Sequence, residues 1–239
     1  MNIFVYDAYL DKYKKTIRII EESLNKLNLQ GKILYLKNIK NLKEAITNEI
    51  GSGAKTIISV GNDKTAISII NILANISENI PMAIIPIGSN NYIAESIGVP
   101  NEKEACYILS SRRIEKIKLI EANDLLFINN FFIKNKGTIA NIDNSYQLSP
   151  QKDGSIFVYN LPPKKILFES IKINPQDNIL NLCIETKPNS KTHLPIKSIE
   201  IINEKEKGIL DNFTEIKTPI RIKASEKSIS LIVGKERAF

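Results

Sequence analysis

The sequence of 239 residues is poor in the residues that build metal centres and covalent cross-links. It has one histidine, His193, and two cysteines, Cys106 and Cys183, which lie far apart and form no C-x-x-C pair. A disulfide framework and a thiolate zinc site are therefore excluded, and a Ser/His/Asp arrangement has no support. This cysteine usage is typical of a cytoplasmic protein.

Long hydrophobic runs are also absent. The longest uncharged segment, 79–94, is shorter than a membrane-spanning helix and is interrupted by Pro81, Pro86 and Gly88. The first residues lack the basic region and the longer apolar core of a signal peptide. The sequence therefore predicts neither a membrane span nor secretion, and we expect a cytoplasmic location.

Tryptophan is missing and aromatic residues make up 7% of the chain, whereas isoleucine alone accounts for 45 residues. Hydrophobic residues make up 43% and charged residues 25%, which is the balance of a folded protein with a sizeable core. Because β-branched side chains favour strands, the interior is expected to be aliphatic and rich in sheet.

The net charge is +7, and most of the excess lies in the second half of the chain. Residues 1–115 carry 14 basic and 12 acidic side chains, whereas residues 116–239 carry 19 and 14. The basic residues are dispersed, which indicates a solvated surface, and no signature of a nucleic-acid-binding module is present. An anionic partner, such as a phosphorylated ligand or an anionic membrane surface, fits the charge better than nucleic acid does.

Short apolar runs alternate with amphipathic segments in the first half. Between Asp11 and Leu27, apolar residues recur every three or four positions, which predicts a helix. We expect strands at 3–6, 32–36, 56–60 and 82–85, and helices at 11–27, 42–50, 65–73, 92–96 and 102–110. Strands that alternate with helices predict a parallel sheet that is covered on both faces.

The second half has short apolar runs separated by Asn, Pro, Gly and Lys clusters. Strands are expected at 125–133, 155–159, 164–173, 179–185, 196–202, 219–223 and 229–233. We therefore predict two domains: an α/β nucleotide-binding domain with a parallel sheet at 1–115, and a β-rich, mostly antiparallel domain at 116–239. The last run could pair with either domain.

A polar loop, Gly61–Thr65, directly follows a buried strand and opens a helix. Gly61 permits a tight turn, and the free amides at the start of the helix could hold a phosphate. Asp63 could orient a magnesium ion or a hydroxyl, and Lys64 could pair with a phosphate. An ordinary strand-to-helix turn, with Asn62 or Asp63 as a cap, remains an equal alternative.

A second polar loop follows the next strand, where Gly88, Ser89, Asn90 and Asn91 come in succession. Their amide, hydroxyl and carboxamide groups could bind phosphate, ribose or a base edge without carrying charge. The alternative is a polar turn that caps the helix starting at Tyr92. Because ligands of parallel sheets bind beyond the carboxyl ends of the strands, two such loops on consecutive strands indicate one cleft.

Three motifs, Val60–Thr65, Ile84–Ala94 and Ile97–Pro100, resemble those of the diacylglycerol kinase catalytic-domain family. The family shows G-G-D-G-T after its third strand, then P-x-G-T-x-N-D-F-A, then L-G-I-P, and this sequence has the three blocks in the same order and at the same separation. The resemblance implies the fold shared by NAD kinases and diacylglycerol kinases. It also implies ATP and Mg²⁺ as cofactors, and phosphoryl transfer to the hydroxyl of a lipid such as diacylglycerol or sphingosine.

The resemblance also assigns roles to particular residues. The nucleotide-binding positions are Gly61, Asn62, Asp63, Lys64, Thr65, Gly88, Ser89, Asn90 and Asn91, and Asp63 is expected to act in catalysis as well. Asp177 falls on the carboxylate that holds magnesium, with Asp153 as a competing match. Asp211 falls on the D-G-E element that carries the general base, but Phe213 stands where the base itself belongs.

The sequence departs from the family at several of these positions. Asn62 and Lys64 replace glycines, and the first strand is followed by Asp7-Ala8-Tyr9-Leu10 in place of a glycine-bearing phosphate turn. The leading hypothesis is an ATP-dependent lipid kinase that meets its substrate at an anionic surface, such as the inner face of a membrane. The alternatives are a catalytically impaired nucleotide-binding relative and, third, an NAD kinase-like enzyme. The oligomeric state is open, and a homodimer is compatible with the sequence.

Overall fold

The computed structural model describes residues 1–162, 173–186 and 190–239. The chain divides into two compact units, one formed by Met1–Ile117 with Ile229–Ala238 and the other by Lys118–Ser228. Within the described residues, no helix is both long enough and apolar enough to cross a membrane.

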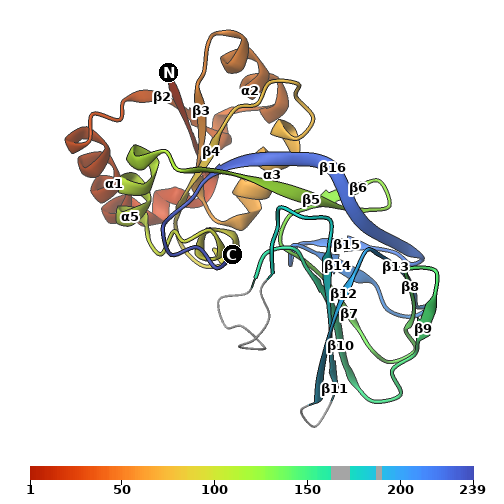
Figure 1. The fold of residues 1–239 in the computed structure, drawn as a ribbon. Coiled ribbons are helices and arrows are strands. Elements are labelled where there is room, and N and C mark those ends of the chain that lie inside the picture. The colour runs from red at the N-terminus through yellow and green to blue at the C-terminus, as the bar shows by residue number, and fades with distance from the viewer. Residues whose placement is uncertain (163–172, 187–189) are drawn as a thin grey trace. The chain divides into compact units, whose positions relative to one another are not determined.

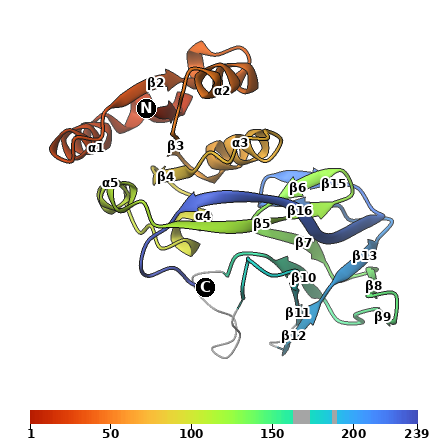
Figure 2. The ribbon, with the colours of Figure 1, turned by 45° about the horizontal axis from the view of Figure 1, so that its top comes forward.

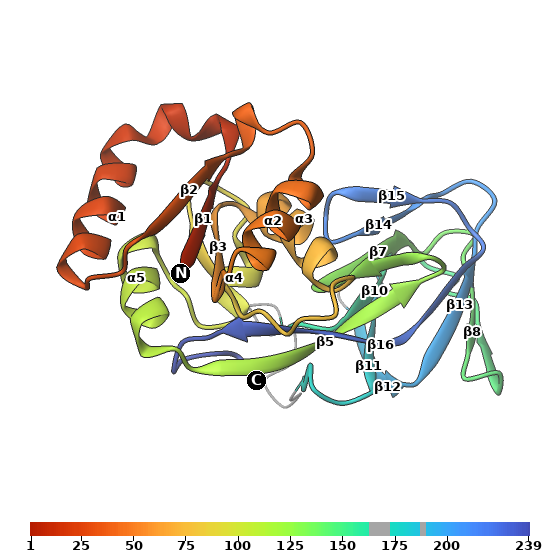
Figure 3. The ribbon, with the colours of Figure 1, turned by 90° about the horizontal axis from the view of Figure 1, so that it is seen from above.

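The first unit alternates helices with the strands of a parallel sheet (Figure 1). The strands lie in the order β2-β1-β3-β4, and each neighbouring pair is parallel. Figure 3 shows α1 and α5 on one side of these strands and α2 and α3 on the other. In chain order the elements are β1 (Asn2–Tyr6), η1 (Ala8–Tyr13), α1 (Lys14–Lys26), β2 (Gly31–Tyr35), η2 (Leu36–Asn38), α2 (Leu42–Gly51), β3 (Thr56–Gly61), α3 (Asp63–Leu73), β4 (Met82–Pro86), α4 (Tyr92–Ser96) and α5 (Glu102–Ser111).

Burial on both faces explains the apolar strand sequences of this unit. All six residues of β3 and all five of β4 are buried. Helix α3 buries Ala66, Ile69, Ile70 and Leu73, which recur at the spacing of one helical face. Each fully buried isoleucine contributes about 2 kcal/mol of transfer free energy. The parallel sheet covered by helices, predicted for the first half, is confirmed.

The regular elements of the second unit, where the structure describes it, are all strands. They are β5 (Ile114–Ala122), which starts in the first unit, β6 (Leu125–Phe127), β7 (Asn130–Lys134), β8 (Ile139–Ile142), β9 (Tyr146–Leu148), β10 (Gly154–Tyr159), β11 (Leu180–Thr186), β12 (Ser190–Ile196), β13 (Ser198–Ile202), β14 (Gly208–Leu210), β15 (Thr214–Ile216) and β16 (Ile220–Ile232). One sheet has the order β12-β11-β10-β7-β14-β15 and is antiparallel throughout. Figure 2 shows β10, β11 and β12 of this sheet next to one another. The β-rich antiparallel second half is therefore also confirmed.

Strand β16 serves both units. Its first residues pair antiparallel with β13, as in the pair Ile222↔Ile199, and its last residues lie parallel to β4, with Leu231 opposite Met82. The sequence predicted two runs here, 219–223 and 229–233, because the intervening residues are polar. The structure joins them in one strand of 13 residues.

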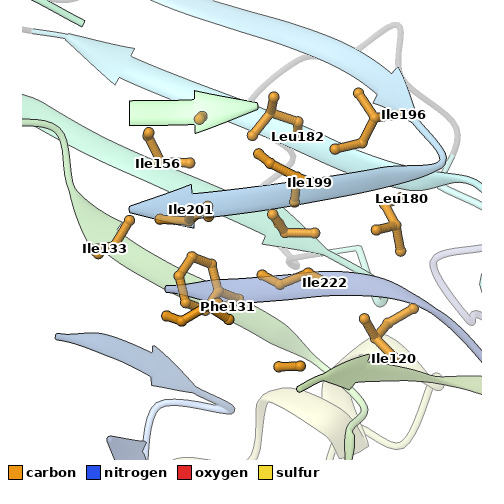
Figure 4. Packing of buried hydrophobic residues seen from close by; sticks show 14 of the residues in the cluster. Ile120, Phe131, Ile133, Ile156, Leu180, Leu182, Ile196, Ile199, Ile201 and Ile222 are labelled. Atoms are coloured by element: carbon orange, nitrogen blue, oxygen red, sulfur yellow. The ribbon is translucent and has the colours of Figure 1, made fainter. Parts of the chain in front are cut away.

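The core of the second unit lies between its two sheets (Figure 4). Ile156, Leu180, Leu182 and Phe131 come from the antiparallel sheet, and Ile199, Ile201 and Ile222 come from β13 and β16. Each of these side chains is at most 2% exposed. Alternate residues of one strand therefore fill this core, as the period of two in a strand requires.

Two further predicted strands of the second half differ from the structure, and a third is not tested by it. The run 125–133 is split into β6 and β7 because the amides of Ile128 and Asn129 bond to the Asp211 carboxylate. The run 196–202 is divided between two strands, because Ile196 ends β12 and the rest of the run forms β13. A turn at Lys197, whose amide donates to Asp143, separates the two strands. The predicted strand 164–173 lies outside the described residues except for Ile173.

Candidate functional site

The two polar loops meet at the carboxyl ends of β3 and β4. These strands are neighbours, and their last residues, Gly61 and Pro86, lie opposite each other. The Ile87 amide donates to the Gly61 carbonyl at 2.9 Å, and the Asp63 amide donates to the Asn90 carbonyl at 3.0 Å. The structure therefore brings together the residues of both loops.

Asp63 connects the first loop to the helix that follows the second. Its side chain is 2% exposed, and its two carboxylate oxygens accept the Tyr92 amide at 2.8 Å and the Ile93 amide at 3.1 Å. These amides lie in the first turn of α4, where N–H groups have no partner within the helix itself and where the helix dipole has its positive end. The observed contacts give Asp63 a structural role, and a catalytic role stays a prediction.

Glycine is required at positions 61 and 88 for different structural reasons. A Cβ on Gly61 would lie 2.8 Å from the Thr65 hydroxyl oxygen. Gly88 has φ +80°, and a Cβ there would lie 3.0 Å from the Tyr13 hydroxyl oxygen. Asn90 also has a positive φ, of 63°, which asparagine tolerates better than most residues. Gly88 and Asn90 thus turn the second loop tightly enough to reach the first.

The side chains that face solvent at this edge are Lys64, Ser89 and Asn90, which are all exposed. Asn62 caps α3, because its side-chain oxygen accepts the Lys64 amide at 3.1 Å. Asn91 donates to the Gly88 carbonyl at 2.9 Å, and its buried side-chain oxygen has no hydrogen-bond partner among the described residues. One cation and several neutral polar groups therefore form the accessible part of the two loops.

The segment after β1 lies against the same two loops. The Thr65 hydroxyl donates to the Asp7 carboxylate, and the Tyr9 hydroxyl donates to the Ile87 carbonyl at 2.8 Å. The rings of Tyr9 and Tyr13 meet edge to face at 5.8 Å. Burial, followed by the charge of Asp7, raises the pKa of Tyr9, so its hydroxyl stays protonated and remains a donor.

Sequence reasoning registered Asp7 and Tyr9 only as departures from the family pattern. The signal that could have placed them is local: an aspartate directly after a strand, two residues before an amide that it caps. In the structure Asp7 accepts the Tyr9 amide at 3.4 Å and begins η1. The contacts to the loops depend on the parallel pairing of β1 with β3 and were not predictable from the segment alone.

Asp211 lies in the second unit and is 4% exposed. Its carboxylate accepts the amides of Ile128, Asn129 and Asn130, the shortest of these bonds being 2.7 Å from Asn129. Burial raises the pKa of Asp211 to about 6, against the opposing effect of these amide donors. The observed geometry is that of a carboxylate that holds two segments together, and its predicted role in catalysis is untested.

Asp211 and Phe213 belong to the turn of a hairpin. β14 and β15 pair antiparallel, with Leu210 opposite Thr214, and Asp211 and Asn212 have φ values of 50° and 64°. Asparagine and aspartate adopt this left-handed conformation most readily after glycine. The Asp-Asn pair is therefore explained by the turn, and the Phe213 side chain is 37% exposed at its end.

The two candidate magnesium carboxylates lie in exposed turns of the second unit. Asp177 accepts the Ile179 amide at 2.8 Å and thereby closes its own turn, and Asp153 is exposed shortly before β10. In the part of the chain that the structure describes, no three His, Cys, Asp or Glu side chains are grouped so that they could hold a metal ion. These residues do not fit a magnesium site built from three protein ligands.

Comparison with known proteins agrees with this architecture. The model of the diacylglycerol kinase catalytic domain family matches residues 8–122, which include both loops. A search of curated proteins found no match.

Solved structures resemble the whole chain. A diacylglycerol kinase from Bacillus anthracis strain Sterne is 19% identical, with a TM-score of 0.76 over 99% of this chain and 97% of that one. An NAD kinase from Archaeoglobus fulgidus, solved in complex with ATP, is 16% identical, with a TM-score of 0.61 over 100% and 96%. At these identities the likeness concerns the fold. The chain therefore has the fold of diacylglycerol and NAD kinases, and its residues 8–122 match the model of the diacylglycerol kinase catalytic domain family.

Proposed function

We propose that the protein is an ATP-dependent phosphotransferase whose acceptor is the hydroxyl group of a lipid. The observation that carries this proposal is the joining of the two loops at one edge of the parallel sheet, inside the segment that matches the kinase family. A phosphate chain is the ligand that such an edge suits, since the exposed side chains of Lys64, Ser89 and Asn90 are presented together.

Each accessible residue has a task in this proposal. Lys64 neutralises phosphate charge as a point cation, and Ser89 and Asn90 donate hydrogen bonds to phosphate or ribose oxygens. Asp63 holds the two loops together, because its carboxylate bonds to the first amides of α4, directly after the second loop. Positioning and charge stabilisation of this kind supply most of the catalysis of phosphoryl transfer.

Magnesium is part of the family's chemistry, but the described residues offer it no cluster of three protein ligands. Asp177, the predicted ligand, is exposed and hydrogen-bonded within its own turn. The proposal therefore depends on the nucleotide loops alone.

Radiolabelled ATP, offered together with vesicles that contain diacylglycerol or sphingosine, tests the activity. Labelled lipid phosphate is the expected product, and NAD in a parallel reaction tests the NAD kinase alternative. We expect Lys64→Gln to weaken ATP binding about tenfold, which is the loss of one charge-assisted bond. Lys43→Gln is the matched control, because Lys43 is also the second residue of an exposed helix start. No phosphorylated lipid across the panel would refute the lipid kinase.

Nucleotide binding without transfer is the second candidate. It is favoured by the buried, amide-bonded Asp211 carboxylate and by Phe213 at the position where the family carries its base. ATP would then raise the melting temperature without any product, by the equivalent of about 2.7 kcal/mol at a hundred times the Kd. Product formation in the lipid or NAD assay excludes this candidate.

A further inference from the structure

The first unit contains a pocket of about 530 Å³ that shares no residue with the two loops. One face of α5 forms its first wall, through Glu104, Tyr107 and Ile108. Its second wall is the segment Val233–Glu236, which follows β16. The volume is within the usual range for small-molecule sites, about 300 to 1,000 Å³.

Backbone contacts hold the second wall in place. The Val233 amide donates to the Arg113 carbonyl at 2.8 Å, and the Gly234 amide donates to the Ile97 carbonyl at 2.9 Å. A Cβ on Gly234 would lie 2.0 Å from the Gly98 carbonyl oxygen, so the two main chains touch there. The pocket is therefore built by tertiary contacts of the first unit.

Four charged side chains line this pocket: Arg113, Lys235, Glu104 and Glu236. The described residues provide no ion-pair partner within 4.0 Å for any of the four. The Val233–Arg113 backbone bond places the two cationic residues on neighbouring segments. Two positive and two negative groups, each available for a partner, suit a ligand that carries both signs of charge.

The apolar part of the pocket is also incompletely covered. Tyr107 is 46% exposed, although it lies in the middle of α5, and Pro100 is exposed as well. A half-exposed tyrosine beside aliphatic side chains offers a surface for a ring or an alkyl group. The charged groups and this surface together define the ligand.

We propose that this pocket binds a small zwitterionic amino compound with an apolar side chain, of which a free aromatic amino acid is the simplest example. Arg113, assisted by Lys235, receives the carboxylate, for which a guanidinium provides two parallel donors. Glu104 and Glu236 receive the ammonium group, and the side chain lies against Tyr107. This site is independent of the proposed kinase activity.

The test compares three probes by NMR, with the amides of Gly98 and Gly234 as reporters. L-phenylalanine carries both charges, 3-phenylpropanoate lacks the ammonium group, and 2-phenylethylamine lacks the carboxylate. We expect L-phenylalanine to bind at least about tenfold more tightly than either analogue, because each analogue leaves charged groups of the pocket without a partner. Equal affinities for the three probes, or no shift of either reporter with any probe, would overturn the proposal.

Substitutions assign the charges. Arg113→Gln should weaken the binding of L-phenylalanine about tenfold and leave the binding of 2-phenylethylamine unchanged, since the amine has no carboxylate for Arg113 to bind. Lys103→Gln removes the same charge at an exposed position of α5 that does not line the pocket. It should leave the affinities for both probes unchanged. Arg113 is exposed, so the variant is expected to fold, and its NMR spectrum verifies this. An equal loss for both probes in Arg113→Gln would contradict the assignment.

Discussion

Asp7 places a negative charge beside the loop that is proposed to hold phosphate. Its carboxylate accepts the Thr65 hydroxyl, and its Cβ lies 3.2 Å from the position that a Cβ on Gly61 would occupy. Asp7→Asn removes this charge and keeps both contacts: the asparagine oxygen can accept the Tyr9 amide, and its NH2 group can donate to the Thr65 hydroxyl, whereas the two carboxylate oxygens of Asp7 each accept one of these groups. The substitution therefore isolates the electrostatic effect of Asp7 on the loop.

The magnitude follows from Coulomb's law. A phosphate about 7 Å from the carboxylate is repelled by about 2 kcal/mol at an effective dielectric constant near 20, and solvent screening at this half-buried site roughly halves that value. A gain of about 1 kcal/mol corresponds to an increase of about fivefold in affinity. We therefore expect Asp7→Asn to bind ATP about five times more tightly than the unsubstituted protein.

Isothermal titration calorimetry with ATP and with adenosine measures this effect. Adenosine carries no phosphate, so its affinity should not change, and the gain for ATP should shrink as salt is added. Asp11→Asn is the matched control, since Asp11 lies on the same segment but is exposed and paired with Lys37 at 3.2 Å. If ATP affinity is unchanged in Asp7→Asn, or rises equally in Asp11→Asn, the proposed position of the phosphates is wrong.

Three further predictions concern the stability and titration of the fold. Asp63→Ala should lower the free energy of unfolding by about 2 to 4 kcal/mol in urea, because two buried amides of α4 lose their acceptor. Because its pKa is raised to about 6, the Asp211 carboxyl should titrate near pH 6 by ¹³C NMR, and a midpoint below 4 would refute its burial effect. The protonated Asp211 carboxyl favours the folded state, so it adds about 3 kcal/mol to the free energy of unfolding at low pH. This contribution is lost as the pH rises from about 4 through 6. Gly88→Ala should cost about 1 to 2 kcal/mol at its φ of +80°, and Tyr13→Phe in the same chain should recover part of that loss.

The parallel sheet was predictable because its sequence signal is strong and local. Strands such as Met82–Pro86 are buried on both faces and therefore consist of unbroken apolar residues. The strand Ile114–Ala122 was missed because charged residues alternate with its apolar ones, and the run was not recognised as a strand. The central part of β16 was missed for a related reason, since exposed Glu226 and Lys227 interrupt its apolar pattern.

The meeting of the two loops was predictable for a topological reason, but the partners of their side chains were not. Consecutive parallel strands place their carboxyl ends at one edge, so Gly61 and Gly88 had to come close. The acceptor role of Asp63 depends on where α4 begins, about 30 residues later in the chain. A residue in a kinase-like motif can thus serve a structural purpose that the motif itself does not reveal.

The balance of charge at the loops is the point on which the function depends. Asp7 and Asp63 are acidic, and Lys64 is the one basic residue of the two loops. The α4 amides compensate Asp63, since they supply two donors and the positive end of a helix. Among the residues that the structure describes, the donors to Asp7 are neutral: the Thr65 hydroxyl and the Tyr9 amide. If Asp7 repels phosphate as calculated, it lowers the affinity for ATP more than the affinity for a ligand with fewer phosphates, such as ADP. The ratio of ADP affinity to ATP affinity should therefore fall in Asp7→Asn, and measuring this ratio before and after the substitution tests the repulsion directly.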